Sequence, residues 1–269
     1  MPELPEVETT RRGIEPHLLH QVIRGAVVRQ EQLRWPVPDL AALLGGHAVQ
    51  AVERRGKYIL LRFAHGTLIV HLGMSGSLRV VPADSPARPH DHVDLLFGER
   101  CLRLHDPRRF GAILWAEGAP LTHPRLRDLG PEPLSDAFDG GHLRRAAARR
   151  RVAIKHLIMD GTVVVGVGNI YASEALFHAR IRPQTVCRRI SSARLDALAD
   201  AIKGVLSRAI ERGGTTLRDF VNESGEPGYF AQELFVYGRA GEPCRRCATP
   251  IRTLQIGQRA SAYCPKCQQ

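Results

Sequence analysis

The chain has 269 residues, enough for two modest domains that each have a hydrophobic core. Hydrophobic residues make up 43% of it and charged residues 24%, an ordinary globular composition that excludes wholesale disorder. The formal net charge of +11 favours a polyanionic partner, of which nucleic acid is the commonest, although a generically basic protein has the same charge.

The sequence offers no signal for a membrane. No apolar run approaches the roughly 20 residues that a membrane-spanning helix needs, and the first residues lack the apolar segment of a signal peptide. We therefore expect a cytoplasmic protein without membrane contact, in which disulfides do not form. Cys101 and Cys187 are expected to be buried as small hydrophobic residues.

The first part of the chain predicts a helix followed by a β-rich domain. Residues 3 to about 18 predict a short helix with acidic residues at its start, as helix N-termini prefer. Six short apolar segments then predict antiparallel hairpins, and so a sandwich or a barrel over residues 1–117. These expected strands are Tyr58–Phe63, Thr67–Leu72, Ser77–Val81, Val93–Phe97, Cys101–His105 and Ala112–Ala116.

The second part predicts helices, which makes the fold class α+β. Residues 118–141 are rich in proline and glycine and read as a linker. A helical domain is expected over residues 142–235, where Ala193–Arg212 repeats apolar residues at helical spacing and packs a core. Ser191 or Ser192 is the expected cap of this helix, and Gly213-Gly214 its end.

The last segment, residues 236–269, contains two cysteine pairs. Cys244-x-x-Cys247 and Cys264-x-x-Cys267 are separated by sixteen residues (248–263), a spacing typical of a four-cysteine zinc site. A hairpin between the pairs would bring their turns together around one ion. We expect one structural Zn²⁺, since the pattern leaves no open coordination position. The hairpin is basic, so that it either contacts DNA or only stabilises the C-terminus.

Gly166-x-Gly168 precedes a helix that is expected to begin near Ile170. Two glycines allow backbone amides to approach an anion, and a helix N-terminus is a ready phosphate site. An ordinary tight turn between helices explains the same segment. The third glycine and the βαβ unit of a dinucleotide-binding fold are missing, which excludes that fold.

The start of the chain, Met1-Pro2-Glu3-Leu4-Pro5-Glu6-Val7-Glu8, resembles that of the formamidopyrimidine-DNA glycosylases. Further segments resemble motifs of this family in the same order along nearly the whole chain. They are Arg55–Tyr58, His71–Gly76, Asp106–Gly111, Gly166–Ala172, Gly228–Gln232 and the zinc hairpin with Gln258-Arg259. Leu4 favours this family over its sister, endonuclease VIII, which typically begins Pro-Glu-Gly-Pro. Gly161 departs from the family pattern, outside these motifs.

The resemblance implies a bifunctional DNA glycosylase and AP lyase of base excision repair. Such an enzyme excises 8-oxoguanine and formamidopyrimidines from double-stranded DNA and then cuts the strand by β,δ-elimination. It implies an N-terminal helix plus β-sandwich, a helical domain with a helix–two-turns–helix element, and a zinc-finger hairpin. The expected partner is double-stranded DNA with oxidised bases or abasic sites, which places the protein at the nucleoid when bound. A monomer is expected.

Pro2 is the expected nucleophile. With Met1 removed, its secondary amine attacks the sugar C1′, and the cationic iminium that results acidifies the neighbouring proton for elimination. An α-amine has a reference pKa of about 8, against about 10.4 for lysine, so more of it is neutral near pH 7.5. Glu3 is the expected general acid and base, although without the resemblance a charge at a helix start would be the preferred explanation. The resemblance counts Lys57 with this site, gripping the phosphate near the lesion.

The resemblance also implies residues that hold DNA. Asn169 and Arg259 are expected phosphate ligands, Lys155 belongs to the same DNA-binding set, and His71 is either a phosphate ligand or a structural histidine.

Met74, Arg108 and Phe110 resemble the wedge of the family, which fills the space left by an extruded base, with Arg108 donating to the orphaned cytosine. Burial in the core is the alternative for Met74 and Phe110. The loop that contacts the lesion is expected near Thr215–Tyr229.

Two other functions remain open at this point. One is an endonuclease VIII-like glycosylase for oxidised pyrimidines, and the other is a zinc-ribbon DNA-binding protein without catalysis. The pair Pro2-Glu3 counts against the second, because a binding module has no need of a processed N-terminal proline.

Overall fold

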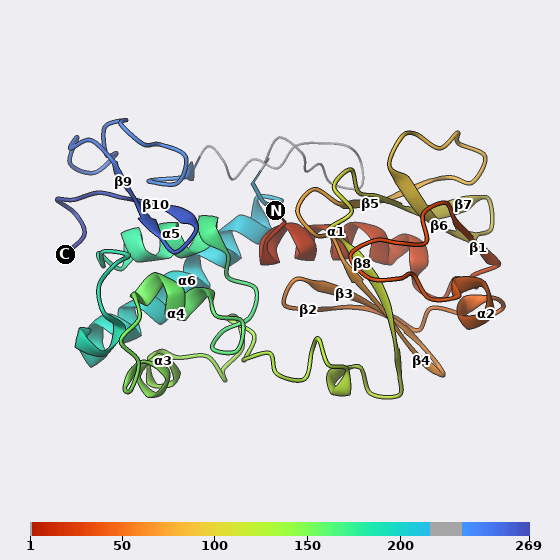
Figure 1. Cartoon of the computed structure of the whole chain (residues 1–269), viewed down its shortest axis with the longest axis horizontal. Coiled ribbons are helices and arrows are strands. Elements are labelled where there is room, and N and C mark those ends of the chain that lie inside the picture. Colours follow the sequence, from red (N-terminus) through yellow and green to blue (C-terminus); the bar gives the residue numbers. More distant parts are fainter. Residues whose placement is uncertain (1, 216–232) are drawn as a thin grey trace. The chain divides into compact units, whose positions relative to one another are not determined.

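The computed structural model describes residues 2–215 and 233–269, and the chain divides into two compact units. The first comprises Met1–Arg127 with Arg212–Tyr229, and the second comprises Asp128–Glu211 with Phe230–Gln269. Sheets dominate the first unit and helices the second (Figure 1). Within the described ranges, no helix combines the length and the apolar character needed to cross a membrane.

The first unit opens with helix α1, Leu4–Leu18, as the sequence predicts. Pro5 lies in its first turn, where a missing N–H costs no helical bond, and Glu3 is its N-cap. The helix buries an apolar face that includes Ile14 and Leu18.

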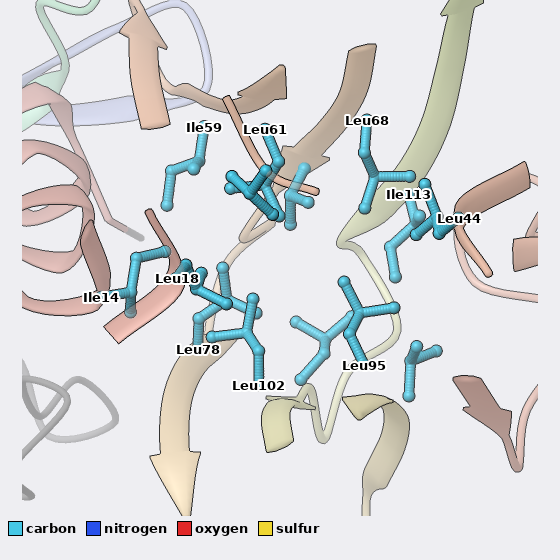
Figure 2. Close-up of a cluster of buried hydrophobic side chains, with 14 of the residues drawn as sticks. Ile14, Leu18, Leu44, Ile59, Leu61, Leu68, Leu78, Leu95, Leu102 and Ile113 are labelled. Carbon is cyan, nitrogen blue, oxygen red and sulfur yellow. The ribbon is translucent and has the colours of Figure 1, made fainter. Parts of the chain in front are cut away.

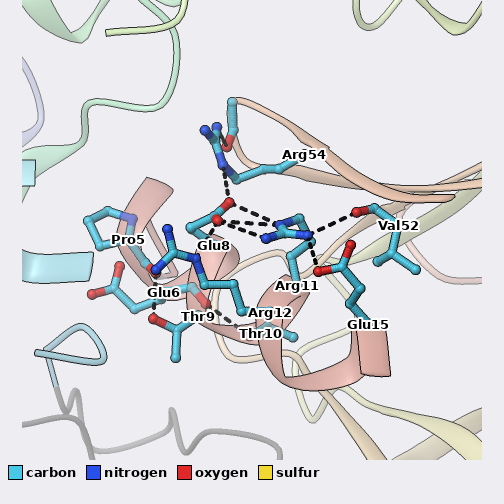
Figure 3. Close-up of polar contacts among 11 residues, drawn as sticks. Pro5, Glu6, Glu8, Thr9, Thr10, Arg11, Arg12, Glu15, Val52 and Arg54 are labelled. Atoms are coloured by element: carbon cyan, nitrogen blue, oxygen red, sulfur yellow. Dashed lines mark hydrogen bonds and ion pairs between the residues drawn. The ribbon is translucent and has the colours of Figure 1, made fainter. Parts of the chain in front are cut away.

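The side of α1 that faces Val52 and Arg54 carries the network of ion pairs in Figure 3. Burial would raise the pKa of Glu8, but hydrogen bonds from Arg11, Arg12 and Arg54 lower it below its ordinary value. Arg54 belongs to strand β2, so its 3.0 Å bond to Glu8 fastens the helix to a sheet.

Two four-stranded antiparallel sheets follow, in the orders β1-β6-β7-β5 and β2-β3-β4-β8. Both contribute side chains to one hydrophobic cluster, among them Leu61 and Leu68 from one sheet and Leu95 and Leu102 from the other (Figure 2). The predicted β-sandwich is therefore confirmed. The strands are β1 Gly25–Val28, β2 Ala51–Arg55, β3 Tyr58–Phe63, β4 Gly66–His71, β5 Ser77–Pro82, β6 Asp91–Phe97, β7 Arg100–His105 and β8 Ala112–Glu117.

The described part of the second unit contains four α-helices and a hairpin. The turns between α4 and α5 give the expected helix–two-turns–helix element, and the apolar stripe of α6 is buried as predicted. Cys187 is buried here, and Cys101 in the first unit, as expected. The elements are α3 Gly140–Ala147, α4 Ile154–Met159, α5 Asn169–His178, α6 Ser192–Glu211, β9 Arg252–Ile256 and β10 Arg259–Tyr263.

Among the helices and strands up to residue 117, three were not predicted from the sequence: β1, β2 and the short helix α2, Leu40–Leu44. Strand β1 has only four residues, none of them fully buried, and β2 carries charged side chains, so neither shows a clear alternation. The proline-rich stretch 118–141 is irregular apart from a 3₁₀ turn at Pro120–Thr122 and the first residues of α3.

Candidate active site

Pro2 and Glu3 are both buried at the start of α1, with Glu3 only 2% exposed. Glu3 and Glu6 form a capping box, in which the Glu3 backbone N–H donates to Glu6 Oε2 at 2.8 Å. The other oxygen of Glu6 accepts from the backbone N–H and the hydroxyl of Thr215, both at 2.9 Å. Glu6 therefore fixes the backbone beside Pro2 and ties it to a residue more than 200 positions away.

Thr215 is the first residue of the loop that is expected to contact the lesion. The rest of that loop, to Tyr229, lies outside the described residues, as does the motif Gly228–Gln232. Gly214 before it has a φ of +82°, and a Cβ there would lie 3.0 Å from Glu6 Oε1, so a glycine suits this approach. The role of Glu6 was not predicted, because a capping box usually begins with Ser or Thr and here begins with Glu3.

Lys57 lies in the turn between β2 and β3, and His71 ends strand β4 opposite Tyr58, with 4.8 Å between the two ring centroids. The Gly73 backbone N–H donates to His71 Nδ1 at 3.0 Å. Burial, together with the positive charges of Lys57 and Arg34, lowers the pKa of His71 to about 4. His71 is therefore neutral at physiological pH, and its ring hydrogen resides on Nε2, where it can be donated.

Two further cations lie near Tyr58, the strand partner of this histidine, and neither was predicted from the sequence. The guanidinium groups of Arg34 and Arg125 lie 4.7 and 4.2 Å from the ring centroid of Trp35. Burial raises the pKa of Tyr58, and the charges of Arg125 and Arg34 offset part of that rise. No local pattern indicates that the segment around Trp35 folds beside β3.

Met74 and Phe110 are exposed on two turns of the first unit, with exposed fractions of 36% and 46%. The core alternative is therefore wrong for both. The two turns touch, because a Cβ on Gly73 would lie 2.4 Å from the Gly111 nitrogen. The guanidinium of Arg108 lies 5.0 Å from the centroid of the Phe110 ring. The structure thus brings the three expected wedge residues together at one surface.

Asn169 and Arg259 lie together in the second unit. Asn169 begins α5, directly after the turn in which Gly166 has a φ of +86°, and its side-chain amide donates to the Ala260 carbonyl at 3.2 Å. Arg259 is exposed at the start of β10. The N-terminus of α5 and the zinc hairpin therefore form one surface.

The position of Lys155 differs from that of a residue in direct contact with DNA, which was the expectation from the sequence. Its side chain is buried, and Nζ donates to the hydroxyls of Ser173 and Ser261, both at 2.9 Å. Nζ also lies 3.4 Å from the Ala260 carbonyl. This burial does not fit a direct DNA contact, because the ammonium group is used to fasten α4 and α5 to the hairpin.

The sulfur atoms of Cys244, Cys247, Cys264 and Cys267 lie within 4.8 Å of one another, and among the described residues they form the one cluster of metal-ligand type. Hydrogen bonds from the Thr249 hydroxyl and backbone lower the pKa of Cys247 to about 6, whereas burial raises the pKa of Cys264 and, to about 12, that of Cys267. Backbone N–H groups also point at Cys244 and Cys264 Sγ at 3.4 Å. Four convergent sulfurs with no other ligand fit one structural zinc ion.

Comparisons with known proteins cover nearly the whole chain. Residues 1–113 match the formamidopyrimidine-DNA glycosylase N-terminal domain, residues 129–221 its H2TH domain, and residues 241–269 the zinc finger found in FPG and IleRS.

Relatives agree with these matches. The proteins named formamidopyrimidine-DNA glycosylase from Methylococcus capsulatus and Stutzerimonas stutzeri are 60% and 59% identical over 271 residues, which is 100% of each chain. The crystal structure of the MutM (Fpg) protein of Thermus thermophilus is 37% identical, with a TM-score of 0.88 over 99% of this chain and 98% of that one. Lactococcus lactis Fpg in complex with DNA that contains an abasic site is 32% identical, with a TM-score of 0.92 over 100% of both chains. The chain therefore belongs to the formamidopyrimidine-DNA glycosylase family.

Proposed function

We propose that this protein is a DNA glycosylase of base excision repair that removes oxidised purines from double-stranded DNA and then cuts the strand as an AP lyase. The observation that carries the proposal is Pro2 beside the buried carboxylate of Glu3 at the start of α1. Solved complexes of Lactococcus lactis Fpg with DNA that contains Fapy-dG or an abasic site support both kinds of substrate.

The chemistry follows from a secondary amine. With Met1 removed, the Pro2 nitrogen forms a bond to C1′ of the damaged nucleotide while the bond from C1′ to the base breaks. The amine loses its one proton, and opening of the sugar ring leaves a cationic iminium. This cation acidifies the C2′ proton, so that elimination expels the 3′ phosphate and then the 5′ phosphate. Glu3 is the general acid and base for the proton transfers at the sugar.

Phosphate contacts hold the DNA in this proposal. Lys57 supplies a charge and neutral His71 an Nε2–H donor in the first unit. Asn169 and the exposed Arg259 supply donors in the second. Lys155 acts one step behind them as a positioning residue. The bound zinc supplies no chemistry to the reaction and holds the hairpin that carries Arg259.

Met74, Arg108 and Phe110 are the wedge. Extruding a base from duplex DNA costs a few kcal/mol, and exposed apolar side chains that enter the vacated stack offset part of that cost. The exposure of Met74 and Phe110, the contact between Arg108 and Phe110, and the close approach of the two turns support this role. We further propose that the enzyme acts as a monomer in the cytoplasm, at the nucleoid when it is bound to DNA.

Borohydride trapping tests the nucleophile. The reduced adduct between protein and abasic-site DNA should map to the peptide that begins with Pro2, and the Lys57→Ala variant should still form it. An adduct that maps to Lys57, or that is lost in Lys57→Ala while DNA binding remains, would assign the chemistry to the lysine. Release assays should show excision of 8-oxoguanine and not of thymine glycol, which separates this function from that of a pyrimidine-specific glycosylase.

A further inference from the structure

Asp106 begins the turn that carries Arg108 and Phe110, yet it is fully buried, with 0% of its surface exposed. Its carboxylate reaches across the whole turn, since Oδ2 accepts from the Gly111 backbone N–H at 2.7 Å. The Asp106 carbonyl also accepts from the Arg109 N–H at 3.2 Å. The four residues between Asp106 and Gly111 are thus closed into a loop by one side chain.

The same residue is fixed to the sheet from the other side. Its backbone N–H donates to the His90 carbonyl at 3.0 Å, and its carbonyl accepts from His92 Nε2 at 2.9 Å. Both partners precede or begin strand β6, next to β7 in the sheet. The backbone of Asp106 therefore fixes the start of the exposed turn to this sheet.

Gly111 connects this turn to that of Met74. A Cβ on Gly111 would lie 2.8 Å from Asp106 Oδ2 and 2.9 Å from the His71 carbonyl. A Cβ on Gly73 would lie 2.4 Å from the Gly111 nitrogen, which is the atom that donates to Asp106. The Gly111 amide that Asp106 holds is therefore in close contact with the turn that carries Met74.

The second oxygen of Asp106 favours a geometric role over a stabilising one. Oδ1 is buried and has no hydrogen-bond partner among the described residues. A buried acceptor without a partner costs stability, so the carboxylate is a poor choice for stability alone. Its other oxygen, in contrast, holds the turn at a defined length.

We infer that Asp106 is a positioning residue for base extrusion: by holding the Gly111 amide it sets the places of both turns that carry Met74, Arg108 and Phe110. This inference rests on the proposed wedge. It predicts that Asp106 affects removal of a paired base, which requires the wedge, and spares strand cutting at an abasic site, which has no base to extrude.

The test is the ratio of two single-turnover rates, for excision of 8-oxoguanine paired with cytosine and for cutting at an abasic site in the same sequence. Asp106→Ala should lower this ratio about tenfold, since small misplacements of interacting groups cost that much or more. Asp106→Asn should stay within about threefold of the parent, because its side-chain carbonyl can still accept from Gly111. An unchanged ratio in Asp106→Ala, or the same loss in both variants, would overturn the inference.

Two more variants separate the inference from the proposal beneath it. Phe110→Ala should also lower the ratio; if it does not, the wedge itself is wrong. If it does and Asp106→Ala does not, only the role of Asp106 falls. Should Asp106→Ala misfold and lose both activities, variants of His92 can be used instead, because His92 donates to the Asp106 carbonyl at the start of the same turn. His92→Leu removes the donor to the Asp106 carbonyl and should lower the ratio, His92→Gln should restore it, and equal ratios in the two would overturn the inference.

Discussion

At the scale of single residues, His71 is a base that the fold keeps neutral. Its Nδ1 accepts from the Gly73 N–H, which a protonated ring cannot do, and burial with the charges of Lys57 and Arg34 lowers its pKa to about 4. The same nitrogen therefore holds the start of the turn that carries Met74.

This pKa predicts a dependence of stability on pH. The unfolded chain takes up a proton at His71 near its ordinary pKa of 6.5, and the folded chain only near 4. The stability that neutral His71 contributes is thus fully present above pH 6.5 and is lost as the pH falls towards 4. We expect His71→Gln to lose less stability between pH 7 and 5 than the parent does.

Tryptophan fluorescence in urea can measure this, because both tryptophans, Trp35 and Trp115, belong to the first unit. His178 is a matched control. Burial, with the charges of Arg208 and Arg246, also lowers its pKa to about 4, but it lies in the second unit. Where the two units unfold in separate transitions, His178→Gln should leave the pH dependence of the tryptophan transition unchanged. A parent-like pH dependence in His71→Gln would show that this histidine does not titrate as described.

At the scale of elements, Lys155 shows how a buried cation holds together the surface that we propose to bind DNA. Its ammonium group joins α4 to Ser173 on α5 and to Ser261 on β10. Lys155→Met should leave both hydroxyls without their donor and loosen the hairpin, at a cost of about 1–3 kcal/mol. We expect faster amide hydrogen exchange in β9 and β10 of the DNA-free protein, together with weaker DNA binding.

Arg259→Ala is the control for this prediction. Arg259 is exposed, so its loss should weaken DNA binding without changing hydrogen exchange in the free protein. If Lys155→Met weakens binding but leaves exchange in the hairpin unchanged, Lys155 acts as a direct contact after all.

The zinc hairpin gives a second prediction at this scale. Cys247→Ser should lose metal and DNA affinity together, because the hairpin that carries Arg259 no longer holds its shape. Cys187→Ser is the matched control: its thiol faces the carbonyls of Ala147 and Arg150, to which a hydroxyl can also donate, so zinc should be retained. Full DNA binding by zinc-free Cys247→Ser would contradict the prediction.

Elements with a strong local pattern were predictable, and those that depend on distant partners were not. Strand β3 has the predicted bounds, Tyr58–Phe63, because Ile59, Leu61 and Phe63 occupy alternate positions and pack in one hydrophobic core. In contrast, β1 is short and partly exposed and is a strand because it pairs with β6. The same division holds at the site. The spacing of the four cysteines alone predicts the zinc site, whereas the hydrogen bond between Glu6 and Thr215 joins residues that only the fold brings together.

At the scale of the whole molecule, the net charge of +11 favours DNA binding but takes no part in the proposed reaction. DNA binding and the reaction can therefore be tested separately. Affinity for DNA comes largely from phosphate contacts, each of which releases counterions, so that the logarithm of the binding constant falls linearly with that of the salt concentration. In the proposed mechanism, neither Pro2 nor Glu3 belongs to that set of contacts. The proposed reaction, in contrast, requires one neutral amine.

A short extension before Pro2 should therefore abolish the reaction and leave DNA binding in place. The Pro2 nitrogen becomes a tertiary amide without a usable lone pair, so borohydride trapping and strand cutting should both disappear. The affinity for abasic-site DNA and its salt dependence should stay close to those of the processed protein. Lys57→Ala should do the reverse: the protein should still form the borohydride adduct but bind DNA more weakly. The slope of the logarithm of the binding constant against that of the salt concentration should decrease in magnitude by about one, as expected for the loss of a single phosphate contact. Trapping by the extended protein would remove Pro2 from the mechanism, and loss of binding would show that the extension blocks the DNA itself.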